Sequence, residues 1–318
     1  MDQITPNKTV GSSSSQPLFG LSDTQQMMFA FGDSRRPNIE TSKIMENIVL
    51  SQITEIASRA VKISQLRGFK SVQLESIIFL MRKSPLKIQR LVKYLTAKEI
   101  TRKATQESEG ELEETVKKKS LVGRCKEFIE SIDATGSLLD ACNADLFDEA
   151  YVEKLLRNDK ITKNMDEKRY DEYCRARVVG FRGSYSVRFQ SQLDDYLARL
   201  ELKLEKTVGE VLSYLAYETL GQLVELCLVV RRDSSRDSVT RLLSTRSVNT
   251  DYPSIYLPPA AGAAVAADNS KVELPGHPIS PAEIREVVRR LQQTCYNDKP
   301  LARGTRHRPA QTMPLIAI

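Results

Sequence analysis

The residues of this sequence that are best suited to chemistry are two adjacent arginines, Arg35 and Arg36, in the stretch GDSRRPNIET. Guanidinium groups bind phosphate oxygens, and each phosphate that they neutralise adds affinity through counterion release. A formal net charge of +6 for the 318-residue chain fits that chemistry. The proline that follows the pair, however, also suits a connection between two helices. The pair is therefore either a phosphate clamp or part of a structural turn.

Three glutamates form a second candidate site. Glu210, Glu218 and Glu225 are eight and seven residues apart, a spacing that keeps them on roughly one side of a helix. Their neighbours in sequence are mostly apolar, and an unpaired carboxylate is costly to bury among apolar groups. We therefore expect Glu218 at the edge of an apolar face or against a basic group. The stripe is either a solvated surface or a contact for a basic partner.

The sequence contains few residues that could act in catalysis or bind a metal. The only histidines are His277 and His307, and each lies in a proline-rich or basic stretch. The five cysteines are Cys125, Cys142, Cys174, Cys227 and Cys295. Their odd number and wide spacing indicate reduced thiols in the cytosol or nucleus. We therefore expect no catalytic residues, no metal site, no bound cofactor and no enzymatic activity.

The composition and the N-terminal sequence limit the classes of protein to which this chain could belong. Charged residues make up 28% and hydrophobic residues 41% of the chain, a balance typical of soluble, helix-rich, intracellular proteins. No run of about 18 apolar residues occurs, so no membrane span is predicted. The N-terminal sequence lacks the basic start and the apolar core of a secretory signal, and residues 1–21 are predicted to be a disordered tail.

The strongest helical pattern covers residues 42–66, where apolar residues recur at steps of three and four. Asn38 is the expected N-cap and Gly68 the expected C-terminal stop. The predicted apolar face consists of Ile44, Ile48, Val49, Ile53, Ile56, Ala57, Ala60, Ile63 and Leu66. A short helix is expected before it, at 24–31, and another after it, in QLESIIFLMRK. This short, long, short order is the plan of a histone fold, which needs a partner of the same kind to cover its long helix.

The second half of the chain repeats the plan. A short helix is predicted at 186–200 and a second long helix at 207–233, followed by a flexible, Ser-, Pro- and Ala-rich insertion at 234–278. A last helix begins after Ser280, with Glu283 completing a capping box. The fold is therefore predicted to be all-α, with two histone-fold halves that pair within one chain. The expected pairing core consists of Ile48, Ile56, Ile63, Leu212, Leu215, Leu223 and Val230.

These patterns divide the chain into five segments, and short amphipathic periods make the segment between the halves a charged, helical connector. The segments are a disordered tail (1–21), a first histone fold with an added C-terminal helix (22–103), the connector (104–183), a second histone fold with its insertion (184–297) and a disordered tail (298–318). The added helix carries the densest basic stretch, residues 81–103. That stretch is either a solvated face or a docking surface for an acidic segment or for nucleic acid.

Several motifs together resemble the suppressor-of-Ty-three family, the histone-fold subunits of the SAGA transcription coactivator. These motifs are MMFAFGDSRRP, SQLRG followed by FLMRK, FIESIDATGSLL, LSYLAYETLGQLVELCLVVR and ISPAEIREVVRRL. The resemblance implies a nuclear, non-catalytic, intramolecular histone-fold pair, rather than a homo-oligomer, whose halves resemble two separate subunits of the initiation factor TFIID. It also implies contacts with the TATA-binding protein and with other histone-fold subunits during initiation by RNA polymerase II. The glutamate stripe is then a candidate contact for a basic surface of the TATA-binding protein.

The sequence departs from this family at the start of the third helix of the first half. Family members open this helix with a Ser-Pro-acid-acid run, whereas this chain reads QLES, with Gln73 in place of the cap and Ser76 in place of an acid. Histone folds often form a buried ion pair, or clamp, between an arginine and an acid at this position, and the first half lacks that acid. Glu283 keeps the clamp available in the second half.

In a histone-fold pair, the first loop of one half lies beside the second loop of the other, and in histones these loops hold DNA phosphates. Arg35 and Arg36 would then face the 234–278 insertion, and the opposite pair of loops would include ELKLEK. Both pairs mix acids with bases, whereas a duplex requires several uninterrupted basic contacts. Direct DNA contact is therefore a secondary expectation, and a histone-like DNA-binding subunit is the alternative function. We expect the two arginines to hold the halves or a protein partner in register, through Asp33 or acids of the insertion.

Overall fold

The computed structural model describes residues 21–69, 71–108, 120–143, 147–163, 165–181, 191, 194–195, 198–199, 203–235, 277–297 and 315–316. In these residues the regular structure is helical except for one pair of two-residue strands, so the predicted all-α class is confirmed. Four predicted segments lie largely outside the described residues. They are the N-terminal tail, the helix at 186–200, the insertion at 234–278 and the tail at 298–318.

The first half contains the predicted short, long and short helices. Its elements are α1 (Asp23–Ala30), α2 (Ile39–Leu66), β1 (Ser71–Val72), α3 (Leu74–Met81) and the added helix α4 (Pro85–Ser108). Asn38 caps α2 as predicted, because its side chain accepts hydrogen bonds from the backbone N–H groups of Glu40 at 2.7 Å and Thr41 at 3.4 Å. Gly68 has a φ of 78°, a left-handed conformation that ends the helix and favours glycine.

The second half and the connector supply the other helices. The second half contains β2 (Lys203–Leu204), α10 (Lys206–Ser235) and α12 (Pro281–Asn297). The connector contains α5 (Leu121–Ile132), α6 (Ser137–Asn143), α7 (Glu149–Lys163) and α8 (Glu167–Val178), so it is helical as predicted. With 30 residues, α10 is about 45 Å long, and it contacts α1, α2 and α3 of the first half. No helix in the described ranges is long and apolar enough to cross a membrane.

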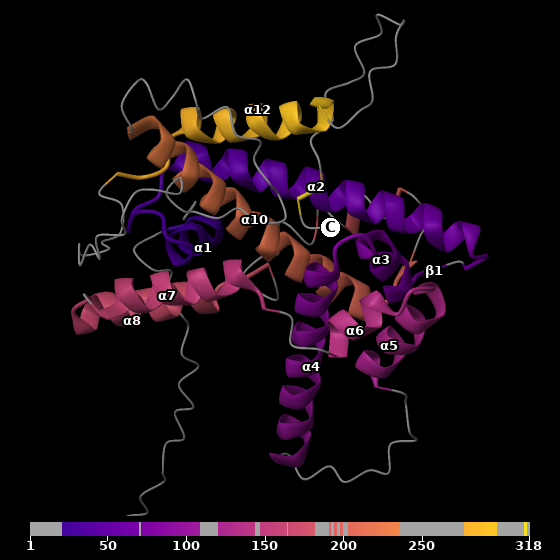
Figure 1. Ribbon diagram of the computed structural model, residues 1–318. Coiled ribbons are helices and arrows are strands. Elements are labelled where there is room, and N and C mark those ends of the chain that lie inside the picture. The colour runs from indigo at the N-terminus through magenta and orange to yellow at the C-terminus, as the bar shows by residue number, and fades with distance from the viewer. Residues whose placement is uncertain are drawn as a thin grey trace, which may run out of the picture.

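The two long helices cross and pack against each other. Figure 1 shows α10 crossing α2, with α12 packed against both near one end of the crossing. At the other end β1 pairs with β2 in parallel, with Ser71 beside Lys203 and Val72 beside Leu204. This strand pair joins the second loop of the first half to the first loop of the second half. It is the arrangement that an intramolecular histone-fold pair requires.

Most of the predicted pairing core is buried, but one side of the predicted face of α2 needs correction. The buried members are Ile56, Leu212, Leu215, Leu223 and Val230. Ile48 and Ile63 are only partly buried, and Leu66 is 88% exposed. The buried stripe instead includes Ser64, whose hydroxyl lies 2.8 Å from the hydroxyl of Ser76. Because each hydroxyl satisfies the other, a polar position can be buried here, which a count of apolar residues does not detect.

The connector packs against the histone-fold helices. Figure 1 shows α7 and α8 next to α1, and α5 and α6 beside α4. Tyr173 of α8 is fully buried, and its ring meets that of Phe29 edge-on at a centroid distance of 5.6 Å. The hydroxyl of Tyr173 donates to the backbone carbonyl of Ala30 at 3.3 Å. The connector is therefore part of the folded unit.

The end of the described chain also departs from the prediction. The sequence predicts a disordered tail at 298–318, yet Ile316 is fully buried and Leu315 packs partly against the same hydrophobic cluster. The prediction is wrong at these two residues. Composition alone cannot show that an apolar pair finds a binding site on the distant helices α2 and α4.

Candidate functional site

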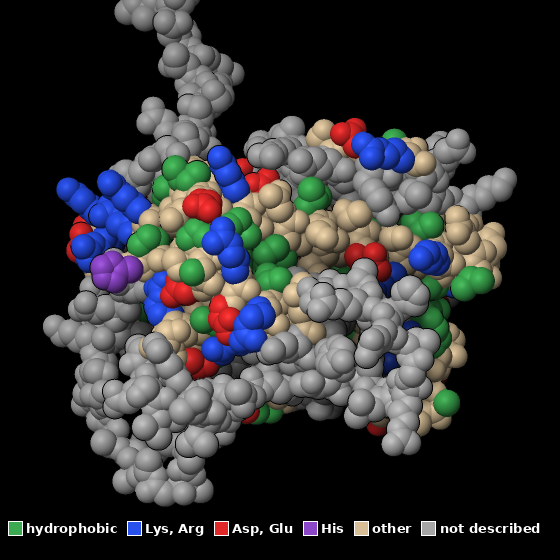
Figure 2. Space-filling model, turned by 90° about the horizontal axis from the view of Figure 1, so that it is seen from above, with side chains coloured by type: hydrophobic (Ala, Val, Ile, Leu, Met, Phe, Trp, Pro, Cys, Tyr) green, Lys and Arg blue, Asp and Glu red, His purple; other side chains and the backbone are tan. Residues whose placement is uncertain are grey.

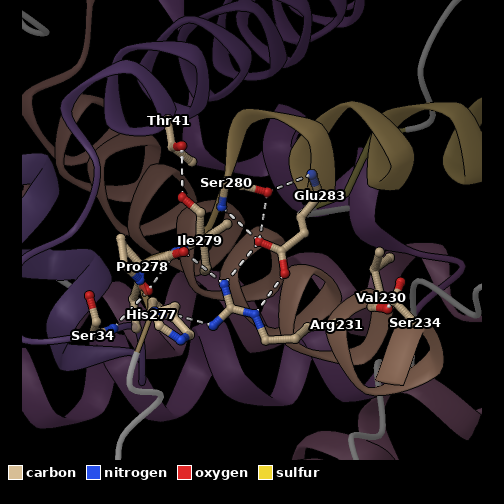
Figure 3. Close-up of polar contacts among 11 residues, drawn as sticks. Ser34, Thr41, Val230, Arg231, Ser234, His277, Pro278, Ile279, Ser280 and Glu283 are labelled. Atoms are coloured by element: carbon tan, nitrogen blue, oxygen red, sulfur yellow. Dashed lines mark hydrogen bonds and ion pairs between the residues drawn. The ribbon is translucent and has the colours of Figure 1, made fainter. Parts of the chain in front are cut away.

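The loop that follows α1 meets the segment that precedes α12, as the histone-fold plan predicts (Figure 3). The carboxylate of Asp33 accepts hydrogen bonds from the backbone N–H groups of Ser34 at 2.7 Å and Ile279 at 2.9 Å. The hydroxyl of Thr41 donates to the backbone carbonyl of Ile279 at 2.8 Å. The first half therefore holds both polar groups of the Ile279 backbone.

Asp33 is a buried carboxyl with an unusual titration range. Burial raises its pKa to about 6, although the hydrogen bonds from the two backbone N–H groups lower it. The positive charge of Arg231 lowers the same pKa and the negative charge of Glu283 raises it. The Oδ2 atom of Asp33 is buried and has no hydrogen-bond donor among the described residues. Asp33 therefore changes charge at a pH where most carboxyl groups are already ionised.

Beside this junction, Arg231 of α10 and Glu283 of α12 form the clamp that the sequence allows in the second half (Figure 3). The guanidinium donates from Nε to Oε1 at 2.6 Å and from Nη2 to Oε2 at 2.9 Å. It also donates to the backbone carbonyls of His277 at 2.8 Å and Pro278 at 2.9 Å. The predicted capping box is present, because Ser280 N–H donates to Glu283 at 2.7 Å and Glu283 N–H donates to the Ser280 hydroxyl at 3.3 Å. Burial raises the pKa of Glu283, but the hydrogen bonds from Arg231 and Ser280 outweigh burial and leave this pKa lowered.

In the first half, the position that corresponds to Glu283 carries no charge. Gln73 precedes α3 and forms no side-chain cap. Ser76 occupies the position of the acid and shares a hydrogen bond with Ser64. At the end of α2, the guanidinium of Arg67 lies over the ring of Phe128 at 5.1 Å. The departure in QLES thus replaces a charged pair with a pair of hydroxyls.

The two arginines of GDSRRPNIET have different environments in the structure. Arg35 pairs with Glu172 of α8, with Nε donating to Oε2 at 2.8 Å and Nη2 donating to Oε1 at 2.7 Å. Arg36 is exposed. Asp33, one of the acids expected to pair with these arginines, instead accepts two backbone N–H groups at Oδ1, and the acids of the insertion lie outside the described residues. Arg35 therefore joins the first half to the connector, and only Arg36 presents an open guanidinium.

The two outer glutamates of the stripe on α10 form ion pairs within the chain. Glu210 pairs with Lys98 of α4, and Glu225 pairs with Arg157 of α7 at 3.2 Å. Glu218 lies between them and is partly exposed. Among the described residues, Glu218 forms no hydrogen bond or ion pair. The stripe is therefore not uniformly solvated, because its outer members hold α4 and α7 against α10.

Glu218 lines a pocket of about 440 Å³ between α4, the start of α7 and α10. On one wall, the rings of Tyr94 and Tyr214 stack at a centroid distance of 4.3 Å. On another, Arg90 donates to both oxygens of Asp148 at 2.5 and 2.7 Å. Burial raises the pKa of Tyr214, and the charge of Glu218 raises it further, so this hydroxyl stays neutral. The pocket thus offers aromatic surface and the carboxylate of Glu218, which forms no hydrogen bond or ion pair with the described residues.

The basic residues of the described chain are interspersed with other types. Figure 2 shows one face of the molecule, on which Lys and Arg side chains alternate with acidic and hydrophobic ones and gather at one edge beside the histidine. The ion pairs of Arg90 and Lys98 also show that the basic stretch of α4 is not simply a solvated face. An uninterrupted basic track is therefore absent from the described part of this face.

Sequence reasoning missed the acids of the connector that complete these contacts. Asp148 accepts a hydrogen bond from the backbone N–H of Tyr151 at 3.1 Å, which is a helix-start signal visible in the sequence. Its pairing with Arg90, and that of Glu172 with Arg35, have no local signal. In the described residues, no three His, Cys, Asp or Glu side chains come together as metal ligands would. Burial raises the pKa of Cys227, so this thiol is a packing group rather than a nucleophile.

Comparison with known proteins places the first half in a family. Residues 20–110 match the family described as transcription initiation factor IID, 18kD subunit. TFIID subunit 13 of Dictyostelium discoideum is 35% identical over 82 residues, which cover 26% of this chain and 76% of that protein. The chain belongs to the TFIID 18 kDa subunit family. The match to this family includes α1, α2, α3 and α4 and ends before the connector helices α5 to α8 and the second half.

Other relatives of this TFIID 18 kDa subunit family member align over most of its length. SAGA complex subunit Spt3 of Schizosaccharomyces pombe is 25% identical over 224 residues, which cover 66% of this chain and 72% of that protein. SAGA complex subunit Spt3 of Drosophila melanogaster is 23% identical over 281 residues, which cover 87% of this chain and 68% of that protein. The predicted resemblance to the suppressor-of-Ty-three family is therefore confirmed.

Proposed function

We propose that this chain is a non-enzymatic subunit of a SAGA-type transcription coactivator in the nucleus. In this role its paired histone fold binds the TATA-binding protein and supports initiation by RNA polymerase II. The observation that carries the proposal is the alignment of a SAGA complex subunit, Spt3 of Drosophila melanogaster, with 87% of the chain. An alignment of this extent includes parts of both halves, so the likeness concerns the paired architecture and not only the first histone fold.

We propose that Glu218 is part of the surface that contacts the TATA-binding protein. The carboxylate lies at the pocket between α4, α7 and α10, and the flanking Glu210 and Glu225 are already paired with Lys98 and Arg157. A basic side chain of a partner can therefore pair with Glu218 without breaking a hydrogen bond or ion pair between described residues. Partial burial beside Tyr214 strengthens such a pair, because less water screens it.

Other histone-fold subunits are the second class of partner that we propose. Relatives of this chain carry the names of subunits of SAGA and TFIID, both of which are complexes. The packing of α10 across α2 already covers the long-helix faces within one chain. Neighbouring subunits would therefore add to the outside of the pair, and a second copy of this chain is not needed to complete it.

A histone-like DNA-binding subunit remains the alternative function. The net charge of +6 and the exposed Arg36 favour it. Against it, the chain's own acids pair with Arg35, Arg90 and Lys98, which leaves fewer cations for phosphates. We therefore keep DNA contact as a secondary role.

A binding assay between the purified full chain and the TATA-binding protein tests the proposal. We expect Glu218→Lys to weaken binding at least tenfold while the melting temperature stays unchanged. Glu130→Lys, at an exposed position of α5, makes the same change of charge and is expected to leave binding unaffected. Equal affinities of the two variants would exclude Glu218 from the contact. No binding by the wild-type chain would overturn the proposed function, and tight duplex binding with a steep salt dependence would favour the alternative.

A further inference from the structure

Ile316 contacts the histone-fold helices through both its side chain and its backbone. The side chain is fully buried in the main hydrophobic cluster, and Leu315 packs partly against the same cluster. The backbone N–H of Ile316 donates to Oε1 of Gln52 at 3.0 Å. The backbone carbonyl of Ile316 accepts a hydrogen bond from Nζ of Lys87 at 2.9 Å.

The two polar residues that hold this backbone are themselves buried. Gln52 of α2 is 5% exposed and Lys87 of α4 is 7% exposed. A buried amide and a buried ammonium are costly unless they are hydrogen-bonded, so helices that only packed against each other would carry apolar residues at these positions. Both groups instead bind the backbone of one residue, Ile316. Their placement fits a site that is completed by a bound segment of backbone.

The pattern of contacts is that of peptide recognition. Hydrogen bonds to the N–H and the carbonyl of one residue supply affinity that does not depend on sequence, and a pocket for the side chain between them supplies selectivity. Here the hydrophobic cluster receives a branched aliphatic side chain, and the neighbouring Leu315 adds apolar contact. The occupant is therefore a short aliphatic segment in which one residue leaves both of its backbone groups open to the helices.

We propose that Gln52 and Lys87 form a peptide-docking site between α2 and α4, and that the chain's own Leu315 and Ile316 occupy it as an exchangeable latch. Because these residues are covalently attached to the chain, their effective concentration at the site is high, and a free peptide competes poorly with them. When the latch is released, the site binds a separate segment of the same chemistry. The proposal does not depend on the contact with the TATA-binding protein.

Binding of a labelled peptide to the full chain tests this site. The peptide comprises residues 309–318, PAQTMPLIAI, and is titrated into the wild-type chain and into Ile316→Asp. An aspartate cannot be buried in the hydrophobic cluster without a large cost, so the substitution releases the latch while the helices stay in place. We expect the peptide to bind Ile316→Asp at least tenfold more tightly than it binds the wild-type chain. A peptide that carries Ile316→Asp is expected to bind neither protein.

A second variant separates recognition from folding. Lys87→Met keeps the length of the side chain and removes the ammonium, so in the Ile316→Asp background it is expected to weaken peptide binding at least tenfold with unchanged helicity. Equal affinity of the Lys87→Met and Lys87 proteins for the peptide would overturn the site. So would a peptide that fails to bind Ile316→Asp, or that binds wild type and variant equally. A wild-type chain that sediments as a dimer and dissociates on Ile316→Asp would place the segment on a second copy and overturn the latch within one chain.

Discussion

The guanidinium of Arg231 forms two hydrogen bonds with the carboxylate of Glu283, one of 2.6 Å from Nε and one of 2.9 Å from Nη2. This pair connects the last turns of α10 to the first turn of α12. The same guanidinium donates to two backbone carbonyls just before α12, so one side chain fixes both the entry and the start of that helix. The position of α12 on the long helices should therefore depend on this pair.

Arg231→Ala is expected to lower the free energy of unfolding by about 2 kcal/mol. The substitution leaves the partly buried Glu283 without its partner and removes the donor of two carbonyls. Arg289→Ala is the control, because Arg289 pairs with Glu286 at a largely exposed position of α12 and should contribute well under 1 kcal/mol. Urea denaturation followed by circular dichroism measures both. Equal effects of the two substitutions would show that the clamp contributes no more than a surface ion pair.

Asp33 should make the stability of the chain fall as the pH rises. Its pKa is raised from 3.8 to about 6 in the folded chain, so the folded state binds this proton more tightly than the unfolded state does. The resulting stabilisation is complete below pH 3.8 and is lost as the pH rises through about 6. It amounts to about 3 kcal/mol at most.

The variant Asp33→Asn isolates this contribution from the other titrating groups. Glu283 beside it acts in the opposite direction, because its pKa is lowered and its stabilisation is lost as the pH falls. We expect the stability of the wild type relative to Asp33→Asn to decrease by about 2 to 3 kcal/mol between pH 4 and pH 7. Urea denaturation at several pH values measures this difference. Parallel pH profiles of the two proteins would contradict the assigned role of Asp33.

Gly221→Ala should destabilise the contact between α1 and α10. A Cβ atom at Gly221 would lie 2.7 Å from Cε1 of Phe31, whose ring is buried and packs on that of Tyr217 at 4.7 Å. We expect a cost of about 1 to 3 kcal/mol from overpacking, which exceeds the gain of about 1 kcal/mol in helix propensity. Gly209→Ala on the same helix meets nothing within 4 Å and should stabilise the chain by up to about 1 kcal/mol. Melting temperatures that rise for both variants would show that the Phe31 ring yields freely.

Arg35→Ala and Arg36→Ala should differ in their effect on the connector. Arg35 holds Glu172 of α8, so its removal should speed amide hydrogen exchange in α8, with a loss of stability of about 1 kcal/mol or less. Arg36→Ala should leave exchange in α8 unchanged.

For the double alanine variant, we expect assembly with partner subunits to weaken before any affinity for duplex DNA does. Loss of duplex affinity with intact assembly would restore the phosphate-clamp interpretation.

Local signals in the sequence predicted the helices and their ends. Asn38 and Ser280 are caps whose hydrogen bonds reach only a few residues along the chain, and Gly68 ends α2 through its own backbone conformation. The proximity of the two loops that contain β1 and β2 was also predictable, because it follows from the histone-fold plan once two long helices are recognised. Each of these features depends on short-range geometry or on the order of the elements.

The partners of the charged residues could not be predicted in the same way. Glu172 is 137 residues from Arg35, and Lys87 is 229 residues from Ile316. Groups so distant in sequence meet only because the connector and residues 315–316 pack against the helices. The same limit applies to Glu218, whose position at a pocket depends on where α4 and α7 pack.

The packing of α10 across α2 within one polypeptide also has a consequence for how the molecule comes apart. Two separate histone-fold subunits dissociate on dilution, and each can then associate with a different mate. Here the association is unimolecular, so the midpoint of thermal unfolding should not vary with protein concentration. The ratio of the two halves is fixed at synthesis, and a cell cannot adjust it by expressing one half in excess.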